Sequence, residues 1–334
     1  MKFGPVAVSE AQGAVLAHSV KLPGARLRKG VVLTADHVAA LRDAGLTQVI
    51  AARLSQGDLD ENTAASKLAA VLVPDPASAG LTVTAPFTGR VNLIADTPGV
   101  AVLNVDALER FNRVHPMITI ATVPPFQQMQ KGGMVATIKI ISYGVPGTDV
   151  DRAAACAPNA LRIAPPVYET AGLVVTDIDG GPGNDKGIRA MEGRVAALGM
   201  DLSDIVTVDH DIDNLARALA GIRGDLVMIL TGSATSDVDD VAPAALRRAG
   251  GVVERFGMPV DPGNLLFLGR MGGRPVIGLP GCARSPALNG ADWVLSRIAC
   301  GVPVTAADIS AMGVGGLLKE IPTRPQPRAG RKPA

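Results

Sequence analysis

The chain has few aromatic residues, few cysteines and almost no net charge. Aromatic residues make up 3% of its 334 positions, which argues against the stacking platforms that bind single-stranded nucleic acid. Its 32 Lys and Arg residues face 31 Asp and Glu residues, a net charge of +1, so no electrostatic feature favours nucleic acid or an anionic membrane as a partner. Cys156, Cys282 and Cys300 are odd in number and far apart, which indicates neither a disulfide framework nor a zinc knuckle.

Long apolar runs are also lacking. The first residues, MKFGPVAVSEAQG, contain no secretory apolar region, and no other run reaches the length of a membrane span. The four histidines show no metal-ligand spacing. A soluble, cytoplasmic protein is expected. Hydrophobic residues make up 47% of the chain and charged residues 19%, so a sizeable core is available, and the length suggests two or three domains.

The first half of the chain predicts two small domains. Residues 1–75 are expected to form a small α+β unit, with one helix at 34–44 that Thr34 caps and Gly45 ends, and a second at about 60–71. Residues 76–164 are expected to form a β-rich domain, a barrel or a sandwich, because short strand-like runs alternate with Gly and Pro. One helix, 107–114, is inserted among them. A swinging-arm attachment site is the functional alternative here, and Lys131 is its only candidate.

From about residue 166 onward, strands and helices alternate. The pattern predicts a three-layer α/β/α domain over residues 165–305, with ligands bound beyond the carboxyl ends of its strands. Three loops are expected at that end: 177–187, 231–240 and 278–285. Residues 306–334 are predicted to be a tail whose last part, rich in proline and arginine, is a disordered end or a linker.

The segment 225–240, DLVMILTGSATSDVDD, contains the most informative of these loops. The apolar run 226–230 predicts a strand buried on both faces, and small residues follow it. A backbone without bulky side chains approaches a ligand closely, and its N–H groups form an anion cradle. A well-capped helix start is the other interpretation, because Asp237, Asp239 and Asp240 precede the helical run 241–249. The small residues are Thr231, Gly232, Ser233, Ala234, Thr235 and Ser236.

The loop 278–285 predicts a second anion contact. Ser285 and Pro286 are typical of an N-cap and a first helical position, and they predict a helix that runs to Ile298. Arg284 would then lie at a helix N-terminus, which suits an anionic ligand. Anion-binding groups beside carboxylates usually indicate phosphate with Mg²⁺. The nearby carboxylates are those of Asp177, Asp179, Asp185, Asp209, Asp211 and Asp239.

Three motifs, in this order, resemble those of molybdopterin-binding domains in molybdenum cofactor biosynthesis. TGSATSDVDD is similar to the family's GG-x-S-x-G-x-x-D loop, GMPVDPGNLLFLG to its PGKP-type segment, and GLPGCARS to its GLPGNPVS loop. Residues 14–53 and 80–145 more faintly resemble the N-terminal half of bacterial proteins that fuse such a domain to a cytidylyltransferase. The resemblance covers about 165–305 well.

The resemblance implies roles for particular residues. Asp239, with Asp209 or Asp211, takes the catalytic positions, and Asp239 and Asp177 take the metal positions for Mg²⁺. The ligand would be molybdopterin or adenylylated molybdopterin, and molybdate is a further candidate substrate. The residues on the ligand-contacting loops are Thr231, Gly232, Ser233, Ala234, Thr235, Ser236, Gly281, Arg284 and Ser285.

The chain departs from the family at several of these positions. Thr231 and Ser236 replace glycines, Cys282 and Ala283 replace Asn-Pro, and Asn264 replaces the PGKP lysine. Three functions stay open: magnesium-dependent handling of a pterin phosphate or adenylate, with molybdenumtransferase-like activity; a carrier or sensor that holds the cofactor without chemistry; and a nucleotide pyrophosphatase. Homo-oligomers, a cytidylyltransferase and a molybdoenzyme maturation factor are candidate partners.

Overall fold

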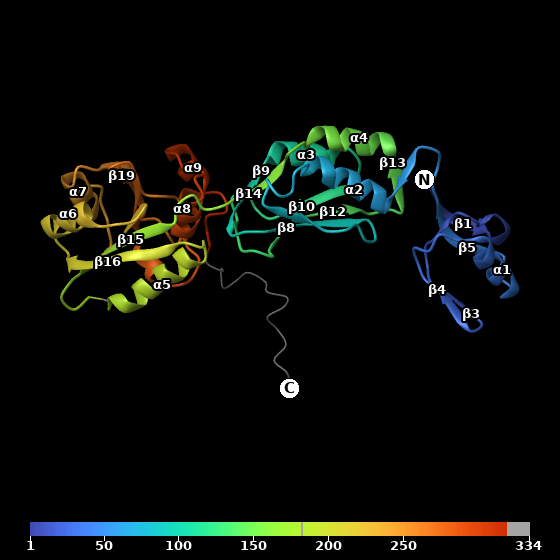
Figure 1. Cartoon of the computed structure of the whole chain (residues 1–334), viewed down its shortest axis with the longest axis horizontal. Coiled ribbons are helices and arrows are strands. Elements are labelled where there is room, and N and C mark those ends of the chain that lie inside the picture. Colours follow the sequence, from blue (N-terminus) through green and yellow to red (C-terminus); the bar gives the residue numbers. More distant parts are fainter. Residues whose placement is uncertain (182, 319–334) are drawn as a thin grey trace. The chain divides into compact units, whose positions relative to one another are not determined.

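The computed structural model describes residues 1–181 and 183–318. The chain divides into two compact units (Figure 1). The first comprises residues 1–97 and 101–164, and the second comprises residues 98–100 and the chain from Pro165 onward. The predicted tail, residues 306–334, begins with a short helix, Ala306–Ala311, and its part from residue 319 onward lies outside the described residues. Within the described part of the chain, no helix is both long and apolar enough to cross a membrane.

The first 60 residues form small sheets around their own core. Strands β1, β5 and β2 pair antiparallel in the order β1-β5-β2, and helix α1 packs Val38 and Leu41 into the core beside them. The Thr34 hydroxyl accepts a hydrogen bond from the His37 N–H at 3.3 Å, which confirms the predicted N-cap. The elements are β1 (Lys2–Ala7), η1 (Val8–Glu10), β2 (Val15–Leu16), β3 (Val20–Leu22), β4 (Ala25–Leu27), α1 (Ala35–Asp43), β5 (Gln48–Arg53) and β6 (Asp58–Asp60).

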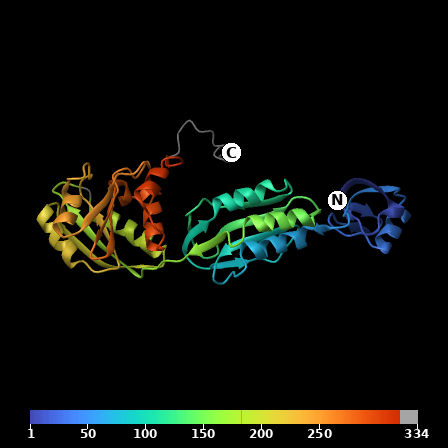
Figure 2. The same ribbon diagram turned by 90° about the horizontal axis from the view of Figure 1, so that it is seen from above.

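The rest of the first unit contains a four-stranded antiparallel sheet, β10-β12-β8-β7, with helices packed against it, a three-stranded sheet, β11-β9-β14, and the strand pair β13-β6. Helices α2 and α3 contact the sheet, and α4 lies beside both of them (Figure 2). The remaining elements are α2 (Glu61–Leu72), β7 (Leu81–Val83), β8 (Arg90–Ala95), β9 (Gly99–Leu103), α3 (Val105–Arg113), β10 (Ile118–Thr122), β11 (Gln128–Met129), β12 (Met134–Ile140), β13 (Gly144–Pro146), α4 (Gly147–Cys156) and β14 (Leu161–Ala164).

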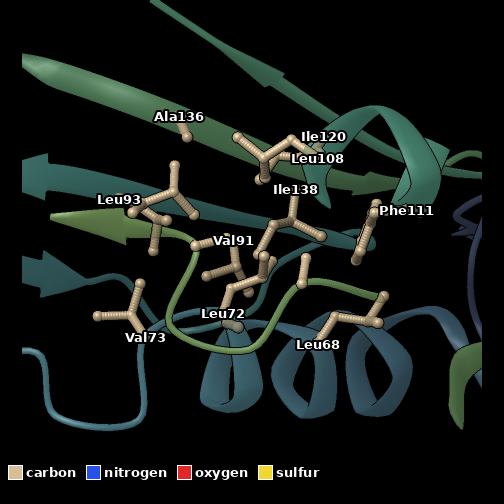
Figure 3. Packing of buried hydrophobic residues seen from close by; sticks show 14 of the residues in the cluster. Leu68, Leu72, Val73, Val91, Leu93, Leu108, Phe111, Ile120, Ala136 and Ile138 are labelled. Carbon is tan, nitrogen blue, oxygen red and sulfur yellow. The ribbon is translucent and has the colours of Figure 1, made fainter. Parts of the chain in front are cut away.

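Helix α2 shares its core with the sheet that follows it in sequence. Leu68 and Leu72 of α2 lie in one buried cluster with Leu93 of β8 and Ile138 of β12, and Phe111 of α3 completes it (Figure 3). The predicted α+β unit over residues 1–75 includes α2. Its alanine-rich helical pattern identifies an apolar face but does not indicate which neighbouring sheet buries that face. Helix α4 was not predicted; its Ala and polar residues give a weak helical pattern.

The second unit is built on a six-stranded sheet in the order β16-β15-β17-β20-β19-β18. The four strands β16, β15, β17 and β20 run parallel; β19 pairs antiparallel with β20, and the edge strand β18 pairs antiparallel with β19. The elements are β15 (Thr170–Asp177), α5 (Asn184–Ala196), β16 (Asp201–Asp209), α6 (Ile212–Gly221), β17 (Leu226–Leu230), α7 (Val241–Arg248), β18 (Val252–Phe256), β19 (Phe267–Met271), β20 (Arg274–Leu279), η2 (Gly281–Arg284), α8 (Gly290–Ala299) and α9 (Ala306–Ala311).

Helices cover both faces of this sheet, as the predicted three-layer α/β/α fold requires. Val227 and Ile229 of β17 pack with α6 and α7 in one core cluster. The alternate residue Leu230 faces α5, where a Cβ on Gly187 would lie 2.8 Å from its side chain. All five residues of β17 are buried, which confirms that the apolar run 226–230 is a central parallel strand.

A large side chain of β19 packs against a glycine of the neighbouring strand β20. Phe267 is the register partner of Gly278, and a Cβ on Gly278 would lie 1.9 Å from the Phe267 ring. The ring therefore occupies the space of the missing side chain. Phe267 is among the largest fully buried side chains of the unit.

Candidate functional site

The predicted loops meet at one edge of the six-stranded sheet. In the parallel ladders, Val175 pairs with Leu230 and Leu230 pairs with Leu279. Strands β15, β17 and β20 therefore end together, and the segments that follow them, 178–181, 231–240 and 280–289, share that edge. We call this group of segments the strand-end site. Its convergence confirms the placement that the sequence pattern predicted.

Loop 231–240 is held by its first residues and leaves later backbone donors open. The Thr231 hydroxyl donates to the Ser233 carbonyl at 2.6 Å, and the Gly232 N–H donates to the Thr176 hydroxyl at 2.9 Å. Within residues 1–181 and 183–318, no hydrogen bond occupies the N–H groups of Ser233, Ala234 and Thr235. Ser233 and Ala234 are exposed. Successive open N–H groups on a small-residue loop form a concave binding site for an anion.

The tight course of this loop explains its glycine. A Cβ on Gly232 would lie 2.9 Å from the Thr176 carbonyl oxygen, which is too close for any side chain without a backbone shift. Ser236 and Thr235 have structural contacts as well: the Ser236 N–H donates to the Asp240 carboxylate at 2.9 Å, and Thr235 is buried against Thr231. Hydrogen bonds therefore anchor the loop on both sides of its open N–H groups, at Gly232 and at Ser236.

Arg284 ties three segments of the site together. Its guanidinium donates to the Thr231 carbonyl at 2.8 Å and to the Asn184 side-chain oxygen at 3.1 Å, the latter in the first turn of α5. Burial lowers the pKa of Arg284, and the nearby Asp177 carboxylate opposes that shift. Because two of its nitrogens bind protein oxygens, Arg284 fixes the loop positions; contact between Arg284 and a ligand stays a prediction.

The predicted helix start at Ser285 is wrong. Residues 281–284 form the short turn η2, and α8 begins only at Gly290, with Asn289 as its N-cap. Asn289 and Asp292 form a reciprocal capping box, which outweighs the Ser-Pro signal. Ser285 is instead in a turn, where its N–H donates to the Cys282 carbonyl at 3.1 Å. Arg284 consequently does not lie at the N-terminus of a long helix.

A buried arginine, which the sequence analysis missed, shapes this same loop. Arg194 of α5 donates to the Ala283 carbonyl at 2.9 Å and to the Ser285 carbonyl at 2.8 Å, and its Nε donates to Asp292 at 2.6 Å. Its side chain is 8% exposed. The available signal was an arginine between Met191 and Val195 on the apolar face of the predicted helix. Arg194 thus binds two carbonyls of the loop from inside the fold, and Gly281 of the same loop is exposed.

His210 is a second residue that the sequence analysis left without a role. Its Nδ1 lies 2.8 Å from the Thr176 hydroxyl, which also accepts the Gly232 N–H. Thr176 is fully buried, and His210 is half-buried at the end of β16. The three residues link the ends of β15, β16 and β17. The sequence gives only a weak indication of this contact, because a threonine at the end of an apolar strand is usually interpreted as a residue of the packed core.

The predicted catalytic carboxylates are dispersed. Asp239 is exposed and accepts a hydrogen bond from Arg247 of α7 at 2.7 Å. Asp211 caps α6, where its carboxylate accepts from the Asp213 N–H at 2.9 Å. Asp177 and Asp209 are both exposed and are register partners on neighbouring strands. The structure thus brings Asp177 and Asp209 together and directs Asp239 toward Arg247.

These carboxylates do not by themselves form a magnesium site. Among residues 1–181 and 183–318, no three His, Cys, Asp or Glu side chains are grouped so that they could hold a metal ion. Mg²⁺ requires near-octahedral oxygen coordination, usually completed by water and substrate phosphate. Asp177 and Asp209 supply two carboxylates on neighbouring strands, and Asp239 contacts Arg247, so the metal roles of Asp177 and Asp239 stay predictions.

Comparisons with known proteins identify this α/β segment. Residues 173–298 match the family model described as "Probable molybdopterin binding domain", and residues 5–53 match a model described as a domain of unknown function. The second unit therefore contains a molybdopterin-binding domain of the kind found in molybdenum cofactor biosynthesis. The matched segment includes β17, the loop 231–240, η2 and most of α8.

Solved structures of molybdopterin biosynthesis proteins are distantly similar to the chain. A MoeA protein from Pyrococcus horikosii is 14% identical, with 90% of this chain and 75% of that chain covered and a TM-score of 0.32. A molybdopterin biosynthesis protein from Mycobacterium abscessus is 18% identical, with 41% and 94% covered and a TM-score of 0.28. A search of curated proteins finds no match.

Proposed function

We propose that the strand-end site binds molybdopterin or adenylylated molybdopterin during molybdenum cofactor biosynthesis or maturation. The observation that carries this proposal is the set of open N–H groups on Ser233, Ala234 and Thr235, within a domain that matches the molybdopterin-binding family. Molybdopterin carries a phosphate, and a phosphate needs several convergent donors. The pterin ring would lie beyond the phosphate, over the edge formed by the ends of β15 and β16.

The first turn of α5 supports the same ligand chemistry. This helix begins at Asn184, and among residues 1–181 and 183–318 no side chain caps its first N–H groups. Asn184 is bound to Arg284, which also binds Thr231 at the phosphate loop. The positive end of the helix dipole therefore lies beside that loop and favours an anion.

Binding without chemistry is the form of this function that the carboxylates favour. Asp239 contacts Arg247, and the guanidinium neutralises the charge that would otherwise repel a ligand phosphate. Asp211 acts as a helix cap. A carrier or delivery role therefore needs no residue beyond those described, whereas magnesium-dependent turnover would have to use Asp177 and Asp209 together with the ligand phosphate.

The test introduces a carboxylate at one of two positions of loop 231–240, either among the open N–H groups or just beyond them. Ala234→Asp puts a carboxylate among the open N–H groups, and Val238→Asp puts one on the same exposed loop beyond them; Val238 is 41% exposed. We expect Ala234→Asp to weaken molybdopterin binding at least tenfold in calorimetry, and Val238→Asp to change it less than threefold. Equal weakening by both variants, or binding unaffected by Ala234→Asp, would contradict the proposed phosphate position.

Enzyme and carrier are separated by the products. Full-length protein is incubated with adenylylated molybdopterin, molybdate and Mg²⁺, and the pterin is analysed by mass spectrometry. A carrier returns the ligand unchanged. Release of AMP that disappears in Asp239→Asn would establish the catalytic alternative.

A further inference from the structure

The first unit contains a polar cavity that takes no part in the strand-end site. It has a volume of about 290 Å³ and lies where the turn after β7, the start of α2 and the end of β12 meet. Ligand pockets in proteins usually begin at about 300 Å³, so the cavity suits a small ligand. Its lining residues are Lys29, Gly30, Glu61, Thr88, Lys139, Ile141 and Tyr143.

Charged side chains dominate this lining. Lys29 and Lys139 supply two positive charges and Glu61 supplies one negative charge. Burial raises the pKa of the Glu61 carboxyl, while Lys139 and Lys29 oppose the shift and Asp60 adds to it. Within the described parts of the chain, no hydrogen bond or ion pair engages the Glu61 carboxylate or the Lys29 ammonium group. A half-buried carboxylate without a partner is costly unless a ligand supplies one.

The other polar groups of the cavity are fixed as donors or structural contacts. The Lys139 ammonium group donates to the Thr88 carbonyl, which leaves two of its three N–H bonds for a ligand. The Tyr143 hydroxyl donates to the Ala17 carbonyl at 3.2 Å. Burial and the Glu61 charge raise the pKa of Tyr143, so it stays a neutral phenol. The cavity therefore offers more open donors than acceptors.

The backbone at the rim is strained in a way that keeps Lys139 in place. Thr88 has a φ of 47°, a left-handed conformation that threonine rarely adopts. Gly89 follows with a φ of 70°, and a Cβ there would lie 2.7 Å from the Ile140 carbonyl oxygen and 2.9 Å from the Glu61 Cβ. This turn presents the Thr88 carbonyl to Lys139. Strained residues cluster at functional sites, because their geometry is retained despite its cost.

We propose that this cavity is a second ligand site, which binds a small phosphorylated molecule that also carries hydroxyl donors. The phosphate contacts the ammonium groups of Lys29 and Lys139, and a hydroxyl group donates to Glu61. This arrangement satisfies the one carboxylate and the open ammonium groups together. A molecule with a phosphate but no donor would leave Glu61 unpaired and would be repelled by its charge.

The experiment uses full-length protein carrying Ala234→Asp, so that phosphate binding at the strand-end site is suppressed. Ribose 5-phosphate, inorganic phosphate and ribose are titrated by calorimetry. We expect ribose 5-phosphate to bind more tightly than inorganic phosphate, and ribose not to bind. Absence of heat with ribose 5-phosphate, or binding of ribose as tight as that of its phosphate, would overturn the proposal.

Two lysine variants are matched to this test. Lys139→Met removes a cavity charge, whereas Lys131→Met removes an exposed charge from the turn before β12 in the same unit. We expect Lys139→Met to weaken ribose 5-phosphate binding at least tenfold and Lys131→Met to leave it within twofold. If Lys139→Met does not fold, the exposed Lys29→Met serves instead. Equal behaviour of the cavity and control variants would sink the assignment. Because the cavity and the strand-end site use different residues, either proposal can fail without the other.

Discussion

The strand-end site and the Lys29–Lys139 cavity offer an anion different kinds of hydrogen-bond donor. In the strand-end site the donors are backbone N–H groups on a loop that buried Thr176 and half-buried Arg284 hold by hydrogen bonds. In the cavity they are ammonium groups around a half-buried glutamate. Backbone donors carry no net charge that pH can remove, and their strength depends on how rigidly the loop is fixed. Charged side chains respond to pH and salt and depend less on the surrounding frame.

The largest effect is expected from the buried frame of the strand-end site. Arg194→Met removes the guanidinium that donates to the Asp292 carboxylate and to the carbonyls of Ala283 and Ser285. Breaking a buried ion pair from one side typically costs about 3–5 kcal/mol, and we expect a loss of that size in the free energy of unfolding, measured in urea. Arg189→Met, an exposed change on the same helix, is the control. Similar stability of the two variants would show that Arg194 does not hold the loop.

A moderate effect is expected at the centre of the same site. Thr176→Val removes the hydroxyl that accepts the Gly232 N–H and contacts His210. An unsatisfied buried donor costs about 1–3 kcal/mol, and the loop that offers Ser233 and Ala234 to the ligand loses an anchor. We expect stability to fall by that amount and molybdopterin binding to weaken about tenfold in calorimetry. Thr176→Ser keeps the hydroxyl and should retain most of the affinity; failure of this rescue would contradict the role.

A small, pH-dependent effect is expected in the cavity. Burial raises the folded-state pKa of Glu61, so ionisation costs the folded protein stability as pH rises through the interval between its unfolded and folded values. The charged groups that face Glu61 are Lys29, Lys139 and Asp60. We expect Glu61→Gln to stabilise the protein by less than about 1 kcal/mol at pH 7, because partial exposure screens the charge. The gain should vanish below about pH 4, where both states hold the proton. A gain that persists there in urea melts would rule out this cause.

The smallest stability effect is expected from Arg247. Its ion pair with Asp239 is exposed, with side-chain exposures of 39% and 83%, and such pairs contribute about 0–1 kcal/mol. We expect Arg247→Met to leave the urea midpoint nearly unchanged but to weaken molybdopterin binding several-fold, because the Asp239 charge is then uncompensated. Mg²⁺ or Asp239→Asn should restore the affinity. Loss of affinity that neither restores would show that Arg247 contacts the ligand directly.

Much of the fold of the second unit is visible in the sequence, because apolar runs and helix caps are local signals. The run 226–230 predicts the central strand, and Asp211 and Asp240 are typical of the residues that cap α6 and α7. The Ser285–Pro286 signal fails because Asn289 and Asp292 make a better cap four residues later. A local pattern cannot decide between two adjacent helix starts when a distant residue, here Arg194, binds the carbonyls between them.

The candidate site is only half predictable for the same reason. The small-residue loop 231–236 and its place at the strand ends follow from residues that are neighbours in sequence. The links from Thr176 to His210, and from Arg284 to Asn184, join residues 34 and 100 positions apart. The hydrophobic periodicity of the sequence gives no information about contacts between residues so far apart. The direction of Asp239 toward Arg247 likewise depends on how α7 is set against the loop, which its sequence does not specify.

The pairing of Phe267 with Gly278 restricts how this domain can change over generations. Replacing Gly278 alone drives a new side chain into the ring, and replacing Phe267 alone leaves a cavity; a buried Phe exchanged for Ala costs about 3–5 kcal/mol. Two residues in such contact are not independent in their effects. Related sequences should therefore keep both residues or exchange them jointly for a smaller and a larger one. Gly278 lies in GLPGCARS, so a glycine at this position of the segment is required by a partner eleven positions earlier in the chain as well as by any ligand.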